Sequence, residues 1–148
     1  EYLNFMADMY QVPREKRLSR MKSLLDRFDM YQAVGDAIQS YSHGMRQKIV
    51  VIGALLHDPS VWILDEPMTG LDPKSSFTLK EMMREHADAG KTVFFSTHVL
   101  EVAERLCDRL AIISRGRIIF SGTLEEIHER FRSDQSLENL FLELTGNE

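Results

Sequence analysis

Val61-Trp62-Ile63-Leu64-Asp65-Glu66-Pro67 is the stretch that decides the fold. Four large apolar residues followed by two adjacent acids are typical of a short strand that is buried on both faces of a sheet. Asp65 and Glu66 would then lie at the carboxyl end of the strand, where open α/β sheets bind their ligands. Because neighbouring side chains at a strand end diverge, one acid could hold a metal ion while the other orients a water molecule.

The stretch upstream, Tyr41-Ser42-His43-Gly44-Met45-Arg46-Gln47-Lys48, predicts a helix start that can bind an anion. Ser42 is a plausible N-cap, and the helix after it would present free backbone N–H groups and the positive end of its dipole. Gly44 removes a side chain where a phosphate must approach. Taken alone, the stretch is better explained as a serine-capped helix after a turn, but the downstream strand reverses this preference. The rest of the helix is predicted to be mostly buried through Ile49, Val50, Ile52, Leu55 and Leu56.

An amphipathic helix is predicted further upstream, between residues 14 and 28. Its apolar residues recur at intervals of three and four: Leu18, Met21, Leu24, Leu25 and Phe28. The opposite face is basic, which indicates either a solvated helix face or a surface near a membrane or a membrane-bound partner.

Downstream of the acids the pattern changes to strand, helix, strand. Asp72-Pro73 combines a capping acid with a proline at the first helical position, and predicts a helix to about Ala89 that Gly90 ends. The buried side of this helix is predicted to hold Phe77, Leu79, Met82, Met83 and His86. Thr92-Val93-Phe94-Phe95-Ser96 predicts a second buried strand, parallel to the first through a right-handed crossover.

The remainder of the chain predicts a helix, a hairpin and two terminal helices. Val99 to Leu106 is the helix, and the apolar segments on either side of Arg115-Gly116 are the two strands of the hairpin. Thr123-Leu124-Glu125-Glu126 is a capping box that starts the first terminal helix. Subdomain boundaries are predicted near Asp58 and after residue 122.

Four motifs in this order resemble those of the ATP-binding cassette (ABC) family of ATPases, in the second half of its nucleotide-binding domain. They are the signature loop (Ser42-His43-Gly44-Met45), the Walker B strand with the catalytic glutamate (Val61 to Glu66), the D-loop (Gly70-Leu71-Asp72-Pro73) and the switch-histidine segment (Ser96-Thr97-His98). The resemblance covers essentially the whole chain. It implies an α/β fold of the P-loop NTPase type, with a helical signature subdomain (residues 1–58), part of a mostly parallel ATPase core (59–122) and C-terminal helices (123–148).

The resemblance also implies roles for particular residues. Asp65 would hold Mg²⁺ through a coordinated water, and Glu66 would be the general base that polarises the water attacking the γ-phosphate of ATP. His98 would donate a hydrogen bond to that phosphate or orient the water. The residues that would contact ATP held by a second nucleotide-binding domain are Ser42, His43, Gly44, Met45 and Asp72. The commonest signature has glycine and glutamine in place of His43 and Met45, and the present form is similar to that of drug- and lipid-exporting members.

A second phosphate-binding pattern is rejected. Gly90-Lys91-Thr92 matches the tail of a P-loop, but the glycine that the full pattern needs five positions earlier is Glu85. The context is also inverted, since a helix precedes this stretch and a strand follows it. Lys91 is therefore assigned no role in ATP binding.

The family's Walker A loop, its aromatic adenine-stacking segment and its Q-loop glutamine are not found, so we expect this chain to be a fragment that is inactive alone.

The composition sets limits on the class of protein. The 148 residues are 43% hydrophobic and 28% charged, as in ordinary globular proteins, and the net charge of −5 gives no support to nucleic-acid binding. Cys107 is the single cysteine, which excludes an internal disulfide and a cysteine metal cluster. No apolar run approaches a transmembrane helix and nothing resembles a signal peptide. We expect a cytoplasmic protein, and the resemblance places it peripherally on the inner face of the cell membrane.

The expected function is that of the ATP-binding and ATP-hydrolysing subunit of an ABC transporter, which dimerises and drives transport through a membrane permease. Two alternatives remain open. A non-transport ABC ATPase of the repair or translation type would hydrolyse ATP with the same residues. Members of the DNA-repair type carry a long coiled coil before the signature, and no sustained heptad repeat precedes Ser42 in this sequence. A non-catalytic partner module would only supply a signature loop to another protein's ATP. The coding sequence upstream of Glu1 distinguishes these, since a Gly-rich loop ending in Gly-Lys-Ser/Thr supports the ATPase and a start codon supports the module.

Overall fold

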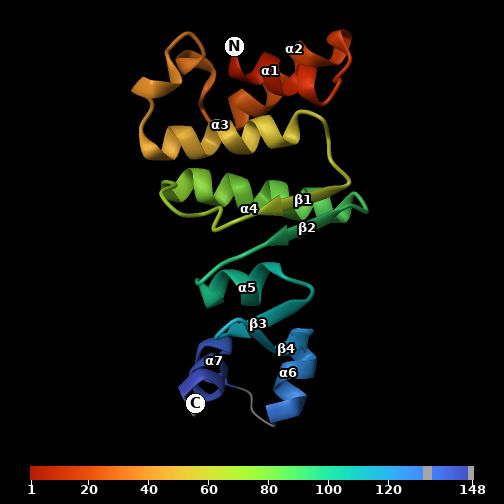
Figure 1. Cartoon of the computed structure of the whole chain (residues 1–148), viewed down its shortest axis with the longest axis vertical. Helices are drawn as coiled ribbons and strands as arrows, with labels where there is room; N and C mark the ends of the chain where they lie inside the picture. The colour runs from red at the N-terminus through yellow and green to blue at the C-terminus, as the bar shows by residue number, and fades with distance from the viewer. Residues whose placement is uncertain (132–134, 147–148) are drawn as a thin grey trace. The chain divides into compact units, whose positions relative to one another are not determined.

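The computed structural model describes residues 1–131 and 135–146 of the chain (Figure 1). The chain forms two compact units, Glu1–Ser96 and Thr97–Glu148. In the described ranges no helix is both long enough and apolar enough to cross a bilayer. The finer division predicted near residues 58 and 122 stays a prediction.

The first unit contains helices and one pair of strands. Its elements are α1 (Tyr2–Met9), α2 (Arg14–Arg27), the short 3₁₀ helices η1 (Tyr31–Ala33) and η2 (Ile38–Ser40), α3 (His43–Leu55), β1 (Val61–Leu64), α4 (Pro73–Asp88) and β2 (Thr92–Phe95). The change from helices to strand, helix, strand therefore occurs where the sequence predicts it.

Helices α1 and α2 both pack against α3. Gly53 in α3 permits the close approach of α1, because a β-carbon at this position would lie 3.1 Å from the ring of Tyr2. Beyond the ends of the same two helices, the rings of Tyr10 and His57 stack with their centroids 3.8 Å apart. Helices α1 and α3 are thus held together by the close approach of Tyr2 to Gly53 and by the stacking of Tyr10 on His57.

The buried side chains of the helices follow the predicted periodicity with exceptions. Met21 and Leu25 of α2 are buried, as predicted. Leu18, Val50 and Phe77, which the pattern places among the buried residues, are 79%, 53% and 59% exposed. These three predictions are wrong because a periodic pattern marks an apolar face, whereas burial requires another element to cover it, and no described element of the first unit covers these positions.

Strands β1 and β2 form a two-stranded parallel sheet. Val61 lies opposite Thr92, and Leu64 lies opposite Phe95, so both strands end at the same edge of the sheet. Helix α4 connects them, which confirms the predicted strand–helix–strand unit.

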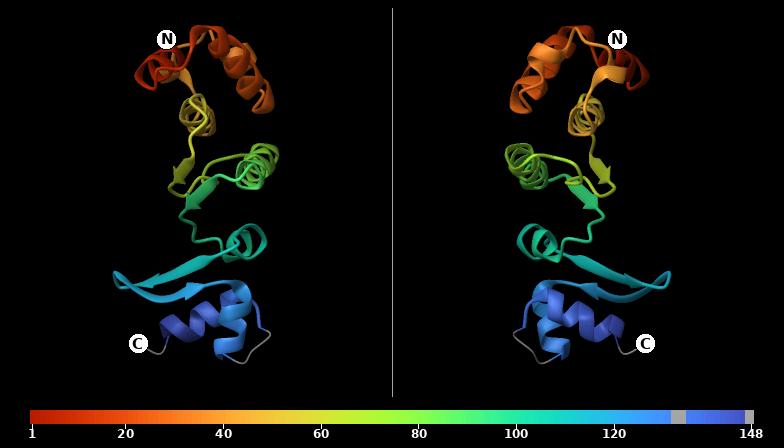
Figure 2. Two further views of the ribbon diagram at one scale, coloured as in Figure 1. Left: turned by 90° about the vertical axis from the view of Figure 1, so that its right-hand side faces the viewer. Right: turned by 90° about the vertical axis from the view of Figure 1, so that its left-hand side faces the viewer.

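Within the described residues of the first unit, one face of this sheet is covered, by α4 (Figure 2). Trp62 is 2% exposed on that face, and its ring meets His86 of α4 edge to face with centroids 5.6 Å apart. Successive side chains of a strand point to opposite faces. Ile63 and Phe94 therefore point away from α4, and they are 71% and 66% exposed. The prediction of strands buried on both faces is wrong for this chain, because no described element of the first unit covers the second face.

The second unit contains α5 (Leu100–Leu106), β3 (Leu110–Ser114), β4 (Arg117–Gly122), α6 (Leu124–Phe131) and α7 (Leu137–Gly146). Strands β3 and β4 form the predicted hairpin, and the φ angles of 46° and 75° at Arg115 and Gly116 fit a type I′ turn. The predicted capping box is present, since the N–H of Thr123 donates to Glu126 at 2.8 Å and the N–H of Glu126 donates to Thr123 at 3.2 Å. The core of this unit consists of Ala103, Ile112, Phe120, Ile127, Leu137 and Leu140.

Candidate functional site

The two acids follow β1 at the edge where both strands of the parallel sheet end. Ser96 follows β2, and its N–H donates to the carbonyl oxygen of Leu64 at 3.0 Å, which extends the strand pairing by one residue. The hydroxyl of Ser96 donates to Oδ1 of Asp65 and accepts a hydrogen bond from the N–H of Glu66 at 2.9 Å. Sequence reasoning quoted Ser96 but gave it no role. Its place after the second of two parallel strands was the signal that could have identified it.

Glu66 has a backbone conformation that residues other than glycine rarely adopt. Its φ angle is 44°, in the left-handed region. Its carbonyl oxygen accepts a hydrogen bond from the N–H of Thr69 at 3.1 Å, so the chain turns directly after the strand. Side chains carried on such backbone are found preferentially at functional sites. The conformation of Glu66 is therefore consistent with a role beyond folding.

The start of α3 contacts the loop that follows the acids. Ser42 caps the helix, as predicted, and its Oγ accepts a hydrogen bond from the N–H of Met45 at 3.2 Å. A β-carbon at Gly44 would lie 2.8 Å from the carbonyl oxygen of Gly70, and a β-carbon at Gly70 would overlap the ring of His43. The missing side chain of Gly44 is thus required by the chain's own loop. The predicted approach of a phosphate to Gly44 stays a prediction.

Two side chains further along α3 hold the same loop. Nε2 of Gln47 donates to the carbonyl oxygen of Pro67 at 3.4 Å, and Nζ of Lys48 lies 3.0 Å from Oδ2 of Asp72. Lys48 is one helical turn after Gly44, so both residues lie on the helix face that meets the loop. The sequence motifs assign no role to Gln47 and Lys48. The four-residue spacing of Gly44 and Lys48 was the signal that could have placed Lys48 on the helix face that meets the loop. The structure therefore joins the predicted signature helix to the predicted D-loop within one unit.

Asp72 is the N-cap of α4, as predicted. Its Oδ1 accepts a hydrogen bond from the N–H of Ser75 at 2.9 Å, and its Oδ2 accepts one from the hydroxyl of Ser75 at 2.6 Å. These hydrogen bonds from Ser75, followed by the ammonium of Lys48, hold the pKa of Asp72 well below its usual range. The carboxylate is therefore ionised at neutral pH. Its predicted contact with a second domain stays a prediction.

His98 belongs to the second unit, in the segment that leads into α5. Beside it, Oγ1 of Thr97 accepts a hydrogen bond from the N–H of Val99 at 3.0 Å, which forms a local turn before the helix. The acids belong to the first unit, so the predicted proximity of His98 to Glu66 stays a prediction.

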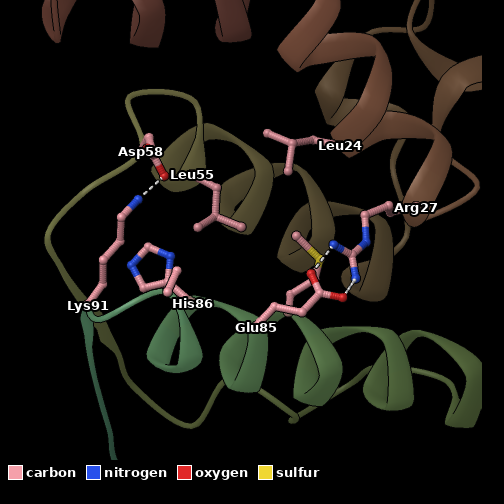
Figure 3. Close-up of a pocket in the computed structure, with 9 residues that line it drawn as sticks. Leu24, Arg27, Leu55, Asp58, Glu85, His86 and Lys91 are labelled. Atoms are coloured by element: carbon pink, nitrogen blue, oxygen red, sulfur yellow. Dashed lines mark hydrogen bonds and ion pairs between the residues drawn. The ribbon is translucent and has the colours of Figure 1, made fainter.

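Lys91 lies at the opposite end of the sheet from the acids, because it precedes β2 whereas the acids follow β1. It forms an ion pair with Asp58 (Figure 3). Across a hollow of about 240 Å³ from this pair, Arg27 makes two hydrogen bonds with Glu85, at 2.5 and 2.8 Å. The other residues that line the hollow are Leu24, Leu55, Met82, His86 and Ala89. The hollow thus lies among α2, α3 and α4 and does not include the acids.

The donors at the strand end fit a magnesium ion that is shared with a nucleotide. Mg²⁺ usually takes one or two carboxylates from the protein and completes its shell with phosphate oxygens and water. Asp65 is exposed and offers such a carboxylate, with one of its two oxygens bonded to Ser96. Within residues 1–131 and 135–146 no three His, Cys, Asp or Glu side chains are grouped to hold a metal. The exposed carboxylate of Asp65 could therefore serve as one protein ligand of such an ion.

Comparison with protein families gives a match over the middle of the chain. A family model described as "AAA domain, putative AbiEii toxin, Type IV TA system" matches residues 20–104. This range includes the start of α3, both strands of the parallel sheet and the two acids.

Known proteins match over nearly the whole chain. EcsA, an ABC-type transporter ATP-binding protein of Bacillus subtilis (strain 168), is 38% identical over 146 residues, which are 98% of this chain and 59% of EcsA. NatA, an ABC transporter ATP-binding protein of the same organism, is 36% identical over 134 residues, or 90% of this chain and 54% of NatA. A solved structure titled "Structure of ATP binding subunit of ABC transporter" superposes with a TM-score of 0.91 at 34% identity, covering 97% of this chain and 60% of the other. The chain thus spans little more than half the length of these proteins.

Proposed function

This chain belongs to the ATP-binding cassette (ABC) family of ATPases, and we propose that it is the part of a transporter's ATP-hydrolysing subunit that carries the catalytic base and the signature loop. In the intact protein two such domains bind ATP between them, and hydrolysis drives a membrane permease at the inner face of the cell membrane. EcsA and NatA are ATP-binding proteins of transporters, which favours transport over the repair or translation alternative.

One observation carries this proposal: the helix that begins at Ser42 is joined by direct contacts to the loop that follows the acids. Lys48 of α3 holds Asp72 of the loop, and Gln47 holds Pro67, directly after the acids. These contacts fix the anion-binding helix start, which serves one ATP, relative to the carboxylates, which serve another ATP with its metal. An ordinary capped helix and an ordinary solvated strand end would not need to be joined in this way.

The hydrolytic step follows from the acids at the strand end. Asp65 would hold Mg²⁺ through a coordinated water, and the ion would neutralise charge on the phosphate oxygens. The carboxylate of Glu66 accepts a proton from the attacking water as the water oxygen bonds to the γ-phosphorus and the bond to ADP breaks. His98 donates a hydrogen bond to the γ-phosphate or orients the attacking water.

The signature loop acts on the ATP of a second domain. The hydroxyl of Ser42 and the N–H of Gly44 donate to the γ-phosphate that the partner domain holds, and the helix dipole adds to this attraction. The N–H of Met45 holds Oγ of Ser42 in place beside that phosphate. His43 lies beside the same turn, and Asp72 contacts the second domain from the loop. Each chain thereby contributes its acids to one ATP and its helix start to the other.

Glu66→Gln in the natural protein that carries this chain tests the assignment of the base. We expect the variant to bind ATP and dimerise as the wild type does, while its ATPase rate falls by about 10² to 10⁴-fold, since general-base catalysis is lost. Glu81→Gln makes the same chemical change on the exposed side of α4 and should keep the wild-type rate. Wild-type turnover by Glu66→Gln would refute the base assignment, and a wild type that neither binds nor hydrolyses ATP would refute the function.

Residues 1–148 expressed alone are expected not to hydrolyse ATP, because no stretch in them satisfies the full P-loop pattern. Measurement of phosphate release from the purified chain tests this. Hydrolysis that Glu66→Gln abolishes would show that the chain is catalytically complete without a P-loop.

A further inference from the structure

Ser96 occupies the point where β2 reaches the acids. In the parallel register Leu64 pairs with Phe95, so the next residues of the two strands, Asp65 and Ser96, are also side by side. The N–H of Ser96 donates to the carbonyl oxygen of Leu64 at 3.0 Å, which fixes the backbone of Ser96 at this position. The serine is therefore placed by the sheet itself rather than by a loop.

The hydroxyl of Ser96 contacts both acids at once. A serine hydroxyl has one proton to donate and two lone pairs that accept. The proton is directed to Oδ1 of Asp65, and a lone pair accepts the hydrogen bond from the N–H of Glu66 at 2.9 Å. One hydroxyl thus links the side chain of one acid to the backbone of the other.

Each of these two contacts has a consequence for its acid. The bond to Oδ1 fixes the orientation of the Asp65 carboxylate and leaves its second oxygen for a ligand. The bond from the N–H supports Glu66 in its left-handed conformation, with φ at 44°. Since such a conformation is unfavourable for a residue with a β-carbon, it persists only where surrounding contacts hold it.

We propose that Ser96 is a positioning residue of the hydrolytic site, which orients the metal-binding carboxylate of Asp65 and fixes the backbone from which Glu66 reaches the attacking water. This inference rests on the proposed function of the two acids. Groups that orient metal ligands typically affect metal affinity or activity by 10- to 100-fold when they are removed. Ser96 acts on a carboxylate in this way and on the neighbouring base through the same oxygen.

The first test needs no nucleotide and measures amide hydrogen exchange by NMR in the full chain. Ser96→Ala removes the acceptor of the Glu66 N–H, so this amide should exchange about tenfold faster, as expected for the loss of one hydrogen bond. Ser96→Thr keeps the hydroxyl on a residue suited to strand ends and should restore the protection. Ser60→Ala, at the opposite end of the same strand pair, should leave it unchanged. Equal exchange at Glu66 in wild type and Ser96→Ala would overturn the inference.

The second test uses the natural protein and follows metal and turnover separately. With ATP and Mn²⁺ as the probe, Ser96→Ala should raise the Mn²⁺ concentration needed for half-maximal binding by about tenfold and lower kcat by a similar factor, with little change in the KM for ATP. Ser96→Thr should recover most of both. If Ser96→Ala matches the wild type while Glu66→Gln is inactive, the inference fails and the proposed function stands. If neither variant changes turnover, the assignment of Glu66 as the base fails together with the inference, while ATP hydrolysis by the wild type still supports the function.

Discussion

The carbonyl oxygen of Gly70 lies against the α-carbon of Gly44, so closely that a β-carbon on Gly44 would approach it to 2.8 Å. The two glycines come from different elements, α3 and the loop before α4. Their contact brings the helix start and the loop together through backbone atoms alone. Substitution at either glycine therefore changes the distance between two predicted functional motifs.

Gly44→Ala should destabilise the chain. The new methyl group would meet backbone that cannot rotate away, and overpacking of this kind costs about 1–3 kcal/mol. The gain in helix propensity, about 1 kcal/mol, offsets only part of this. The matched control is Gly35→Ala, since a β-carbon at Gly35 meets nothing within 4 Å. Urea unfolding followed by circular dichroism measures both, and equal stability of the two variants would contradict the prediction.

Gly70→Ala should lower the free energy of unfolding more than Gly90→Ala does. Substitution of His43 should restore part of the stability that Gly70→Ala loses. Gly70 has φ of 78°, and its new β-carbon would also overlap the His43 ring. Gly90 has the same φ in open space, so Gly90→Ala reports the backbone strain alone, about 1–2 kcal/mol. Comparison of Gly70→Ala in wild-type and His43→Ala backgrounds isolates the overlap. Identical free-energy changes in both backgrounds would show that the ring does not restrict Gly70.

Two substitutions at Asp72 should separate its cap from its ion pair. Asp72→Asn keeps a good N-cap residue but loses the charge that attracts Lys48, whereas Asp72→Ala loses both. We expect stability to fall in the order wild type, Asn, Ala. Because the folded-state pKa of Asp72 lies below its usual value of 3.8, the charge stabilises the fold above that pH, and the benefit is lost as pH falls toward the folded pKa. The difference between wild type and Asp72→Asn in acid-titrated melting curves should therefore begin to narrow below about pH 4 and keep narrowing as the pH falls further toward the folded-state pKa. A difference that stays constant from neutral pH to the lowest pH reached would point to another cause.

The stability of the chain should depend on His57 near neutral pH. Burial lowers the pKa of His57 below its usual range. The unfolded chain therefore binds this proton more readily, so stability is complete above the ordinary histidine pKa and is lost as pH falls through it. His57→Phe keeps an aromatic ring to stack on Tyr10 but cannot titrate. Melting temperatures between about pH 5.5 and 7.5 should fall less steeply for the variant, and parallel curves would assign the dependence to another group.

The features that could be predicted from the sequence depend on residues that are close together in the chain. The caps at Ser42, Asp72 and Thr123 each depend on residues within one turn of the helix start, so their side-chain signals are contained in a few positions. The turn at Arg115-Gly116 is likewise local. The parallel pairing of the two strands followed from their order around a helix.

Contacts between distant segments explain what was missed. Ser96 lies beside Asp65 only because two strands about thirty residues apart share a register, and the contact of Gly44 with Gly70 also joins separate segments. Burial of Ile63 and Phe94 could not be decided from their apolar character, since it depends on an element that covers the second face of the sheet. Periodicity describes a face, and only the assembled structure shows what lies against it.

The position of Trp62 gives this chain an optical reporter of its own. It is the single tryptophan in the sequence, it is 2% exposed, and it lies on β1 three residues before Asp65, which directly follows that strand. Its emission therefore comes from one known place, between the strand that carries the acids and His86 of the helix behind it. A change in intrinsic fluorescence on adding nucleotide or metal can be assigned to movement at that strand, without an attached dye or an engineered residue.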